Sequence, residues 1–220
     1  MTTAATALQA GKIIFLNGTS SAGKTTLAHA LQEVLTEPWL HVALDQYRDG
    51  LPARFRGLNS PPDSEGAQGL NVVPVTDVEQ PYTAVRFGDY GQQVLKGMRR
   101  NIRGLAEQGL NAIIDDILLE PEFLTDYLEV FEGIQVLFVG VRCPRSVINA
   151  RERTRPGRFP GTAIGHYDSC HAHGCYDVEV NTGESSPRVC AQQIAAAMQA
   201  LPSPSIFEQL RSQATEATPR

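Results

Sequence analysis

The chain has 220 residues, of which 42% are hydrophobic and 20% are charged, an ordinary balance for a globular protein that buries its own core. Its formal net charge of −5 argues against a nucleic-acid-binding protein, because such proteins usually carry an excess of basic residues. No apolar run reaches the roughly 18 residues that a membrane-spanning helix needs, and residues 1–10 lack the pattern of a signal peptide. We therefore predict a cytoplasmic protein whose four cysteines are free thiols.

The predicted elements begin after a loose polar arm at residues 1–10. Residues 12–17 form an apolar run of strand length, and residues 27–35 show the apolar spacing of one helix face. Residues 39–44 predict a second buried strand, which leads directly into Asp45. Residues 46–90 are rich in Gly, Pro, Asn and Ser. We interpret them as an insertion over the ligand-binding edge of the sheet, with a short strand or hairpin arm at residues 72–75.

The second half continues the alternation of helices and strands. A helix is predicted over residues 82–108, and its four basic residues, Lys96, Arg99, Arg100 and Arg103, are interpreted as a solvated face. Further strands are predicted at residues 110–114, 135–141 and 176–180, and further helices at residues 121–131, 144–154 and 187–200. Residues 202–220 are expected to be a polar tail with one helical turn near residues 206–210. The alternation predicts a three-layer α/β fold with a parallel sheet.

One stretch carries the clearest chemistry. Residues 18–25 read GTSSAGKT and match the phosphate-binding P-loop pattern G-x-x-x-x-G-K-[ST] in full, between a predicted strand and a predicted helix. In this motif the lysine supplies a positive charge for the β- and γ-phosphates, and the last hydroxyl binds Mg²⁺. We expect ATP to be held by Gly18, Thr19, Ser20, Ser21, Ala22, Gly23, Lys24, Thr25 and Thr26, with Thr25 as a ligand of Mg²⁺.

Carboxylates at predicted strand ends suggest which reaction the nucleotide serves. The sequence lacks the N-K-x-D motif with which GTPases read the base. One strand ends in Asp115-Asp116, whereas motor-type ATPases usually end it in Asp-Glu. Of the common classes of P-loop protein, a small-molecule kinase is therefore the one left. Asp45 is the candidate base for the acceptor hydroxyl, and the alternative is a cap of the next helix. Only one of Asp115 and Asp116 can face the site, because adjacent strand residues point to opposite faces. We prefer Asp116 as a second ligand of Mg²⁺; the alternative is a pair of turn residues.

Arginines follow the helix predicted at residues 144–154. Pro156 disfavours helical geometry at Arg155, so Arg155 and Arg158 are expected on a loop, and an arginine-bearing loop is what the lid of a phosphoryl-transfer enzyme requires. The alternative for each of Arg151, Arg153, Arg155 and Arg158 is a surface charge. The segment CHAHGC at residues 170–175 invites a zinc site, but its spacing does not fit the usual ligand pairs.

Taken in order, these motifs resemble the chloramphenicol phosphotransferase family of P-loop kinases. The resemblance extends from about Ile13 to Ala197. In the first half it rests on the P-loop with Asn17, on EPWL at residues 37–40, on Asp45 and on IIDD at residues 113–116. In the second half it rests on VGVRC at residues 139–143, on Arg151, Arg155 and Arg158, and on YDVEV at residues 176–180. It implies a sheet similar to those of shikimate and adenylate kinases, with five strands in the order 2-3-1-4-5. It also implies that Asp45 is the base, and that Arg158 contacts the transferring phosphate. The lid departs from the family's Arg-Gly-Asp-Arg, because residues 155–158 read RPGR.

These observations divide the chain into an arm at residues 1–10, a P-loop kinase domain at residues 11–201 and a tail at residues 202–220. Within the domain, residues 46–90 are the acceptor-side insertion and residues 151–175 are the lid region. The expected activity is an ATP- and Mg²⁺-dependent O-phosphotransferase acting on a small hydroxylated molecule, with catalytic Asp45, Lys24 and Arg158 and with Arg151 and Arg155 on the nucleotide. Chloramphenicol is the leading named acceptor, and nucleosides, sugars and other antibiotics stay open, since residues 46–90 match the family poorly. The alternatives are a nucleotide-gated regulatory protein and a nucleic-acid 5′-hydroxyl kinase, which would need a basic groove.

Overall fold

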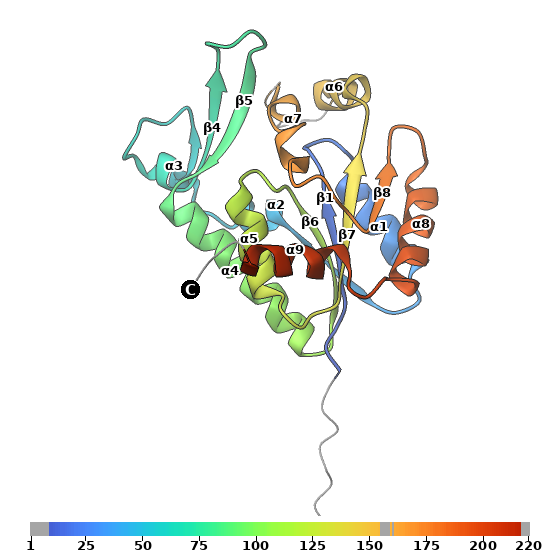
Figure 1. Ribbon diagram of the computed structural model, residues 1–220. Coiled ribbons are helices and arrows are strands. Elements are labelled where there is room, and N and C mark those ends of the chain that lie inside the picture. Colours follow the sequence, from blue (N-terminus) through green and yellow to red (C-terminus); the bar gives the residue numbers. More distant parts are fainter. Residues whose placement is uncertain (1–8, 155–158, 160, 217–220) are drawn as a thin grey trace, which may run out of the picture.

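A central sheet of five parallel strands organises the chain (Figure 1). The structure is a computed structural model, which describes residues 9–154, 159 and 161–216. The strands of this sheet are β1 (Ile13–Asn17), β2 (Trp39–Ala43), β6 (Asn111–Asp116), β7 (Val136–Arg142) and β8 (Val178–Asn181). Their order is β2-β6-β1-β7-β8, which is 2-3-1-4-5 when the strands are counted along the chain. The predicted α/β fold and its strand order are confirmed.

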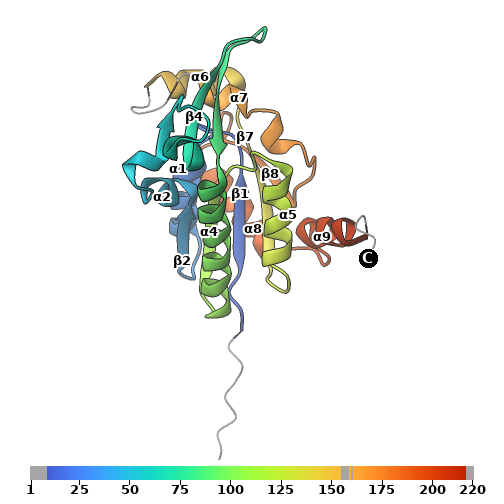
Figure 2. The same ribbon diagram turned by 90° about the vertical axis from the view of Figure 1, so that its left-hand side faces the viewer.

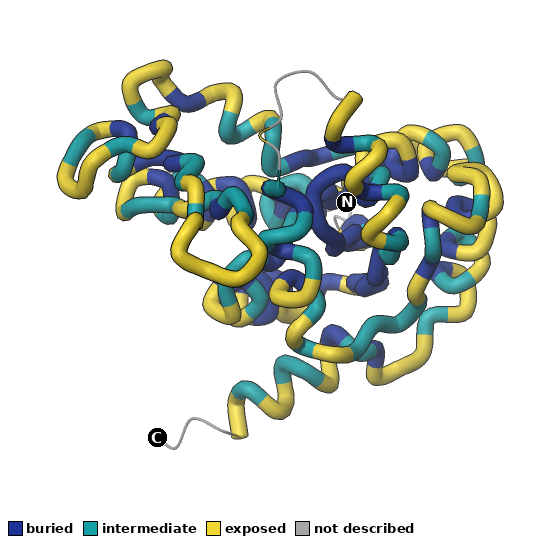
Figure 3. The backbone as a smooth tube through the Cα atoms, turned by 90° about the horizontal axis from the view of Figure 1, so that it is seen from above, coloured by how far each residue is buried: buried dark blue, intermediate teal, exposed yellow. Residues whose placement is uncertain are grey.

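Helices cover both faces of this sheet. Ile13 and Phe15 of β1 face one core, and Ile14 and Leu16 face the other, because alternate strand residues point to opposite sides. The first core is closed by α4 (Asp89–Glu107), α5 (Pro121–Val130) and α9 (Ile206–Glu216), and Figure 2 shows α4 and α5 in front of the sheet. The second is closed by α1 (Lys24–Val34), α6 (Arg145–Thr154) and α8 (Pro187–Gln199). Seen from above, the buried positions gather at the central strands (Figure 3). None of the helices in the described ranges is long and apolar enough to cross a membrane.

The insertion predicted at residues 46–90 forms a second, smaller sheet. Its elements are α2 (Leu44–Asp49), a 3₁₀ turn (Ala53–Phe55), β3 (Arg56–Leu58), α3 (Glu65–Gln68), β4 (Leu70–Val75) and β5 (Tyr82–Phe87). The strand order is β3-β4-β5, and the β4–β5 hairpin extends beyond the edge of the main sheet (Figure 1). The hairpin expected near residues 72–75 is confirmed. The helix expected from residue 82 is wrong at its start: residues 82–87 pair antiparallel with β4, and α4 begins only at Asp89.

The C-terminal segment contributes to the core. Helix α9 is longer than the single turn that we expected, and its Phe207 is fully buried. The Phe207 ring lies 5.8 Å from the ring of Phe138 and 6.5 Å from that of Phe15. Arg211 donates hydrogen bonds to the carbonyl oxygens of Leu128 and Phe131 at 2.8 and 3.1 Å. Helix α9 is therefore attached to the end of α5 by both apolar and polar contacts.

One basic residue of α4 is buried instead of solvated. Arg99 is 1% exposed, so its assignment to a solvated face was wrong. Its guanidinium lies 2.9 Å from the carboxylate of Asp126 and 4.7 Å from the ring centres of Phe123 and Tyr127. Helix α5 supplies all three partners, and together they compensate part of the cost of burying the charge; Nε and Nη2 of Arg99 have no hydrogen-bond partner among the described residues.

Candidate active site

The P-loop forms a concave turn between β1 and α1. Gly23 precedes the helix with φ of 90°, in the left-handed region that glycine adopts without strain. Helix α1 has no acidic residue in its first turn and no side-chain cap hydrogen bond, so no side chain of that turn competes with an anion for its N-terminal amides. The hydroxyl oxygens of Ser20 and Ser21 are buried and lack a hydrogen-bond partner in the described part of the chain. Unpaired donors of this kind fit the oxygens of a bound phosphate chain.

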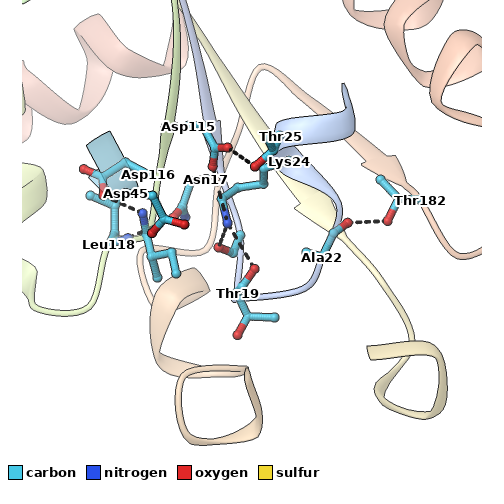
Figure 4. A network of polar contacts seen from close by, with 12 residues as sticks. Asn17, Thr19, Ala22, Lys24, Thr25, Asp45, Asp115, Asp116, Leu118 and Thr182 are labelled. Carbon is cyan, nitrogen blue, oxygen red and sulfur yellow. Dashed lines mark hydrogen bonds and ion pairs between the residues drawn. The ribbon is translucent and has the colours of Figure 1, made fainter. Parts of the chain in front are cut away.

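Lys24, Thr25 and Asp115 meet at the mouth of this loop (Figure 4). The Thr25 hydroxyl donates to the Asp115 carboxylate at 2.7 Å, and Lys24 Nζ lies 3.7 Å from the same carboxylate. Burial alone would raise the pKa of Asp115, but the charge of Lys24, the nearby His41 with Nε2 at 3.6 Å and the hydrogen bond from Thr25 outweigh it and hold that pKa below its usual value. The ionised carboxylate and the hydroxyl are oxygen ligands of the kind that Mg²⁺ requires.

Asp116 points to the other side of the strand. In the sheet, Asp115 lies beside Leu16 and Asp116 beside Asn17. The Asp116 carboxylate accepts hydrogen bonds from the Tyr127 hydroxyl at 2.6 Å and from the Ile117 amide at 2.7 Å. Burial raises the pKa of Asp116, and the hydrogen bond from Tyr127 offsets this only in part. The geometry thus differs from our expectation: Asp115, and not Asp116, contacts Thr25, although Asp116 also borders the cavity described next.

Two cavities meet at Asp45. The first has a volume of about 550 Å³ and is lined by the P-loop, Asp45, Asp115 and Arg151. The second has a volume of about 660 Å³ and is also lined by Asp45. Strand β2 ends at Ala43, so Asp45 lies in the first turn of α2, where its carboxylate accepts a hydrogen bond from Arg48 at 2.7 Å. Asp45 thus borders both the phosphate-binding loop and the second cavity.

The second cavity lies between the smaller sheet and the described part of the predicted lid region. Phe159, Thr162 and His166 line it on the lid side. The His166 ring nitrogen Nε2 accepts a hydrogen bond from the Val85 amide of β5 at 3.1 Å. Burial lowers the pKa of His166, so a neutral ring is expected, with its proton on Nδ1 because Nε2 is the acceptor. The insertion at residues 46–90 therefore builds most of a cavity next to Asp45.

Of the predicted lid arginines, the structure describes Arg151 and Arg153. Arg151 lies against the P-loop: its guanidinium donates to the Thr182 carbonyl at 2.8 Å and to the Thr182 hydroxyl at 3.2 Å. The Thr182 hydroxyl in turn donates to the carbonyl of Ala22 (Figure 4). Arg153 is exposed and, among the described residues, hydrogen-bonds within its own helix, to the carbonyl of Asn149. Arg155 and Arg158 lie outside the described residues.

The CHAHGC segment packs against the end of β1, and sequence reasoning missed the residue that holds it. The four cysteines are free thiols, and burial raises the pKa of Cys170 to about 11. The side-chain amide of Asn17 donates to the Cys170 carbonyl at 2.6 Å and to the Tyr176 hydroxyl at 2.7 Å, and its oxygen accepts from the Leu118 amide at 3.0 Å. His171 contacts the Tyr176 hydroxyl as well. The available signal was a polar amide at the end of an apolar strand, where an unpaired group would be costly.

The parallel sheet, the P-loop between β1 and α1 and the adjoining cavities define a P-loop kinase fold. Three solved kinases share it at low sequence identity. The Mycobacterium tuberculosis APS kinase CysC is 17% identical (TM-score 0.55; 86% of this chain and 98% of that chain covered). A gluconokinase from Sinorhizobium meliloti is 18% identical (TM-score 0.55; 93% and 98% covered), and shikimate kinase from Aquifex aeolicus is 16% identical (TM-score 0.51; 86% and 96% covered).

Sequence comparison identifies the family within this fold. The family model of chloramphenicol phosphotransferase-like proteins matches residues 11–199. The "Putative O-phosphotransferase Rv2636" of Mycobacterium tuberculosis is 34% identical over 211 residues, which cover 91% of this chain and 88% of that protein. The chain belongs to the chloramphenicol phosphotransferase-like family, and the resemblance seen in its motifs is confirmed.

Proposed function

We propose that the protein transfers the γ-phosphoryl group of ATP to a hydroxyl group of a small molecule bound in the second cavity. The observation that carries this proposal is the position of Asp45, which lines the P-loop cavity and the neighbouring cavity at once. Family membership supports a phosphotransferase, and the cavity beside Asp45 is large enough for a drug-sized acceptor. An antibiotic such as chloramphenicol is one candidate acceptor.

The donor side of the reaction belongs to the P-loop. Its backbone amides and the hydroxyls of Ser20 and Ser21 would bind the phosphate oxygens, and Lys24 would bind the β- and γ-phosphates. A Mg²⁺ ion held by Thr25 and Asp115 would neutralise charge on those phosphates. We propose Asp115 for this role in place of Asp116, because its carboxylate already contacts the Thr25 hydroxyl. Arg151, which lines the same cavity beside the P-loop, would also bind the nucleotide.

On the acceptor side of the reaction, Asp45 is the proposed base. Its carboxylate would take the proton of the acceptor hydroxyl as that oxygen attacks the γ-phosphorus, and the bond from the γ-phosphorus to the bridging oxygen would break, leaving ADP. Arg48 holds the Asp45 carboxylate at 2.7 Å and so fixes its direction. We propose Arg158, together with Arg155, as the cations on the transferring phosphoryl group, a role that arginine's planar fork suits.

The test combines an acceptor screen with one substitution. The protein, ATP and Mg²⁺ are incubated with a panel of hydroxylated antibiotics and metabolites, and mass spectrometry detects acceptors that gain one phosphoryl group. Asp45→Asn should lower transfer by roughly 10²–10⁴-fold while the dissociation constant of ATP stays unchanged. Asp49→Asn is the control for the loss of a carboxylate that bonds to Arg48, because Asp49 lies on the same helix and lines the second cavity but not the P-loop cavity; it should retain transfer, although the KM of the acceptor can change. Full transfer by the Asp45 variant would eliminate Asp45 as the base. ATP binding without transfer to any compound would favour a regulatory protein.

A further inference from the structure

The register of the smaller sheet places six cavity-lining residues on one face. Arg56 lies beside Leu70 and Leu58 beside Val72 in the β3–β4 pair. In the β4–β5 pair, Leu70 lies beside Phe87 and Val72 beside Val85. Because paired residues share a face and strand neighbours alternate, the six form one surface. All of them line the second cavity: Arg56, Leu58, Leu70, Val72, Val85 and Phe87.

This surface is apolar at every position except Arg56. The opposite wall of the cavity adds further apolar side chains, those of Leu44, Ile117 and Leu119. Polar side chains such as Ser20, Asp49 and Thr162 line only part of the cavity, so hydroxyl groups of an acceptor that face the apolar walls would lose water without gaining a partner, which is costly. An apolar molecular body, by contrast, gains from covering them. The cavity of about 660 Å³ has the size that drug-like ligands occupy.

Arg56 is the one cation of this cavity that is not already paired within the described residues. Arg48 bonds to both Asp45 and Asp49, at 2.7 and 2.8 Å, so its charge is balanced locally. The neighbouring Arg54 pairs with Glu65 at 3.0 Å. Arg56 is exposed at the cavity wall and forms no ion pair with the part of the chain that is described. Its guanidinium stays charged at all relevant pH values and matches planar anions such as carboxylates.

We propose that the acceptor is an amphipathic alcohol of drug-like size, whose apolar body covers this sheet face and whose anionic group pairs with Arg56. This inference rests on the phosphotransferase function proposed above and specifies its substrate class. The anionic group is a carboxylate or an equivalent oxyanion. The hydroxyl that is phosphorylated lies at the opposite end of the molecule, toward Asp45.

Fluorescence titration tests the anion site without knowledge of the natural acceptor. The full-length protein, saturated with ATP and Mg²⁺, is titrated with 8-anilinonaphthalene-1-sulfonate and with N-phenyl-1-naphthylamine, which has the same aromatic skeleton without the sulfonate. Arg56→Gln should weaken the sulfonate probe about 10-fold and leave the neutral probe unchanged. Arg56→Lys should restore part of the loss, and the control Arg54→Gln should affect neither probe. Equal effects of Arg56→Gln on both probes, or none on the sulfonate probe, would overturn the proposal.

A paired acceptor screen separates this inference from the proposed function. Each aromatic alcohol is offered as its carboxylate and as its methyl ester. The proposal expects a KM for the carboxylate about 10-fold below that for the ester, with similar kcat, and Arg56→Gln should abolish the difference. Phosphorylation of both forms with equal KM would refute the anionic acceptor while leaving the phosphotransferase intact. Phosphorylation of neither form, with the probe still dependent on Arg56, would refute the phosphotransferase and retain the anion site.

Discussion

Arg99→Met is expected to destabilise the protein by about 3 kcal/mol, at the lower end of the range for breaking a buried ion pair. Arg99 is 1% exposed and Asp126 is 9% exposed, so the substitution leaves a carboxylate at the edge of the core without its nearest cation. Arg100 lies 3.6 Å from the same carboxylate and compensates part of the charge, which places the cost at the lower end. Methionine keeps apolar contact with the rings of Phe123 and Tyr127.

A double-mutant cycle measured by urea unfolding isolates the ion pair. Arg99→Met combined with Asp126→Leu removes both charges, and the double variant should regain most of the loss, to within about 1 kcal/mol of the unaltered protein. Arg100→Met is the control, because Arg100 is exposed and should cost less than about 1 kcal/mol. Additive effects of the two core substitutions would refute the reasoning, since they would show that Arg99 and Asp126 do not depend on each other.

Three further predictions concern the site and the C-terminal helix. Asp115→Asn should weaken Mg²⁺-dependent ATP binding about 10-fold in calorimetry, whereas Asp116→Asn should not, because Asp115 contacts Thr25. The two variants should also differ in pH dependence, measured by unfolding between about pH 3 and pH 7. The pKa of Asp115 is lowered, so its stabilising contribution is complete above its usual pKa and is lost as the pH falls, and the deficit of Asp115→Asn should shrink on acidification. The pKa of Asp116 is raised, so its ionisation opposes folding, and the deficit of Asp116→Asn should shrink as the pH rises. Phe207→Ala should cost about 3–5 kcal/mol in urea unfolding, while the exposed control Gln209→Ala should cost less than about 0.5 kcal/mol; equal values would show that α9 is not part of the core.

The donor half of the site could be predicted because it is local in the sequence. Eight consecutive residues, GTSSAGKT, form the loop, and the flanking strand and helix follow from short apolar patterns. Alternation along β6 predicted that only one of Asp115 and Asp116 faces the site; Asp115 is the one that contacts Thr25, but both line the P-loop cavity. Which of the two carboxylates contacts Thr25 depends on how β6 is aligned with β1, and that alignment is a property of the sheet. No pattern within residues 110–116 contains it.

The features that sequence reasoning missed depend on partners distant in the chain. Arg99 resembles its solvated neighbours on α4, and its burial follows only from Asp126 and two rings on α5. The apolar wall of the second cavity has the same origin: Leu58 and Val85 are 27 positions apart, yet both pack beside Val72 because of strand register. Short strands in a Gly- and Pro-rich stretch give only a weak periodic signal, so the hairpin was predicted and the face that lines the cavity was not.

The two halves of the site are joined by a short hydrogen-bonded segment, residues 161–166. Glu152 of α6, which is 8% exposed, accepts from the amides of Gly161 and Ala163 at 2.8 and 2.9 Å. The Ala163 carbonyl accepts from the Thr19 hydroxyl of the P-loop at 2.5 Å, and His166 accepts from Val85 of the smaller sheet. Because each bond satisfies a group that is buried or partly buried, a shift of β5 carries a cost at the P-loop and at α6. The position of the smaller sheet, which is proposed to bind the acceptor, is thus linked through this segment to the loop proposed to bind the phosphates.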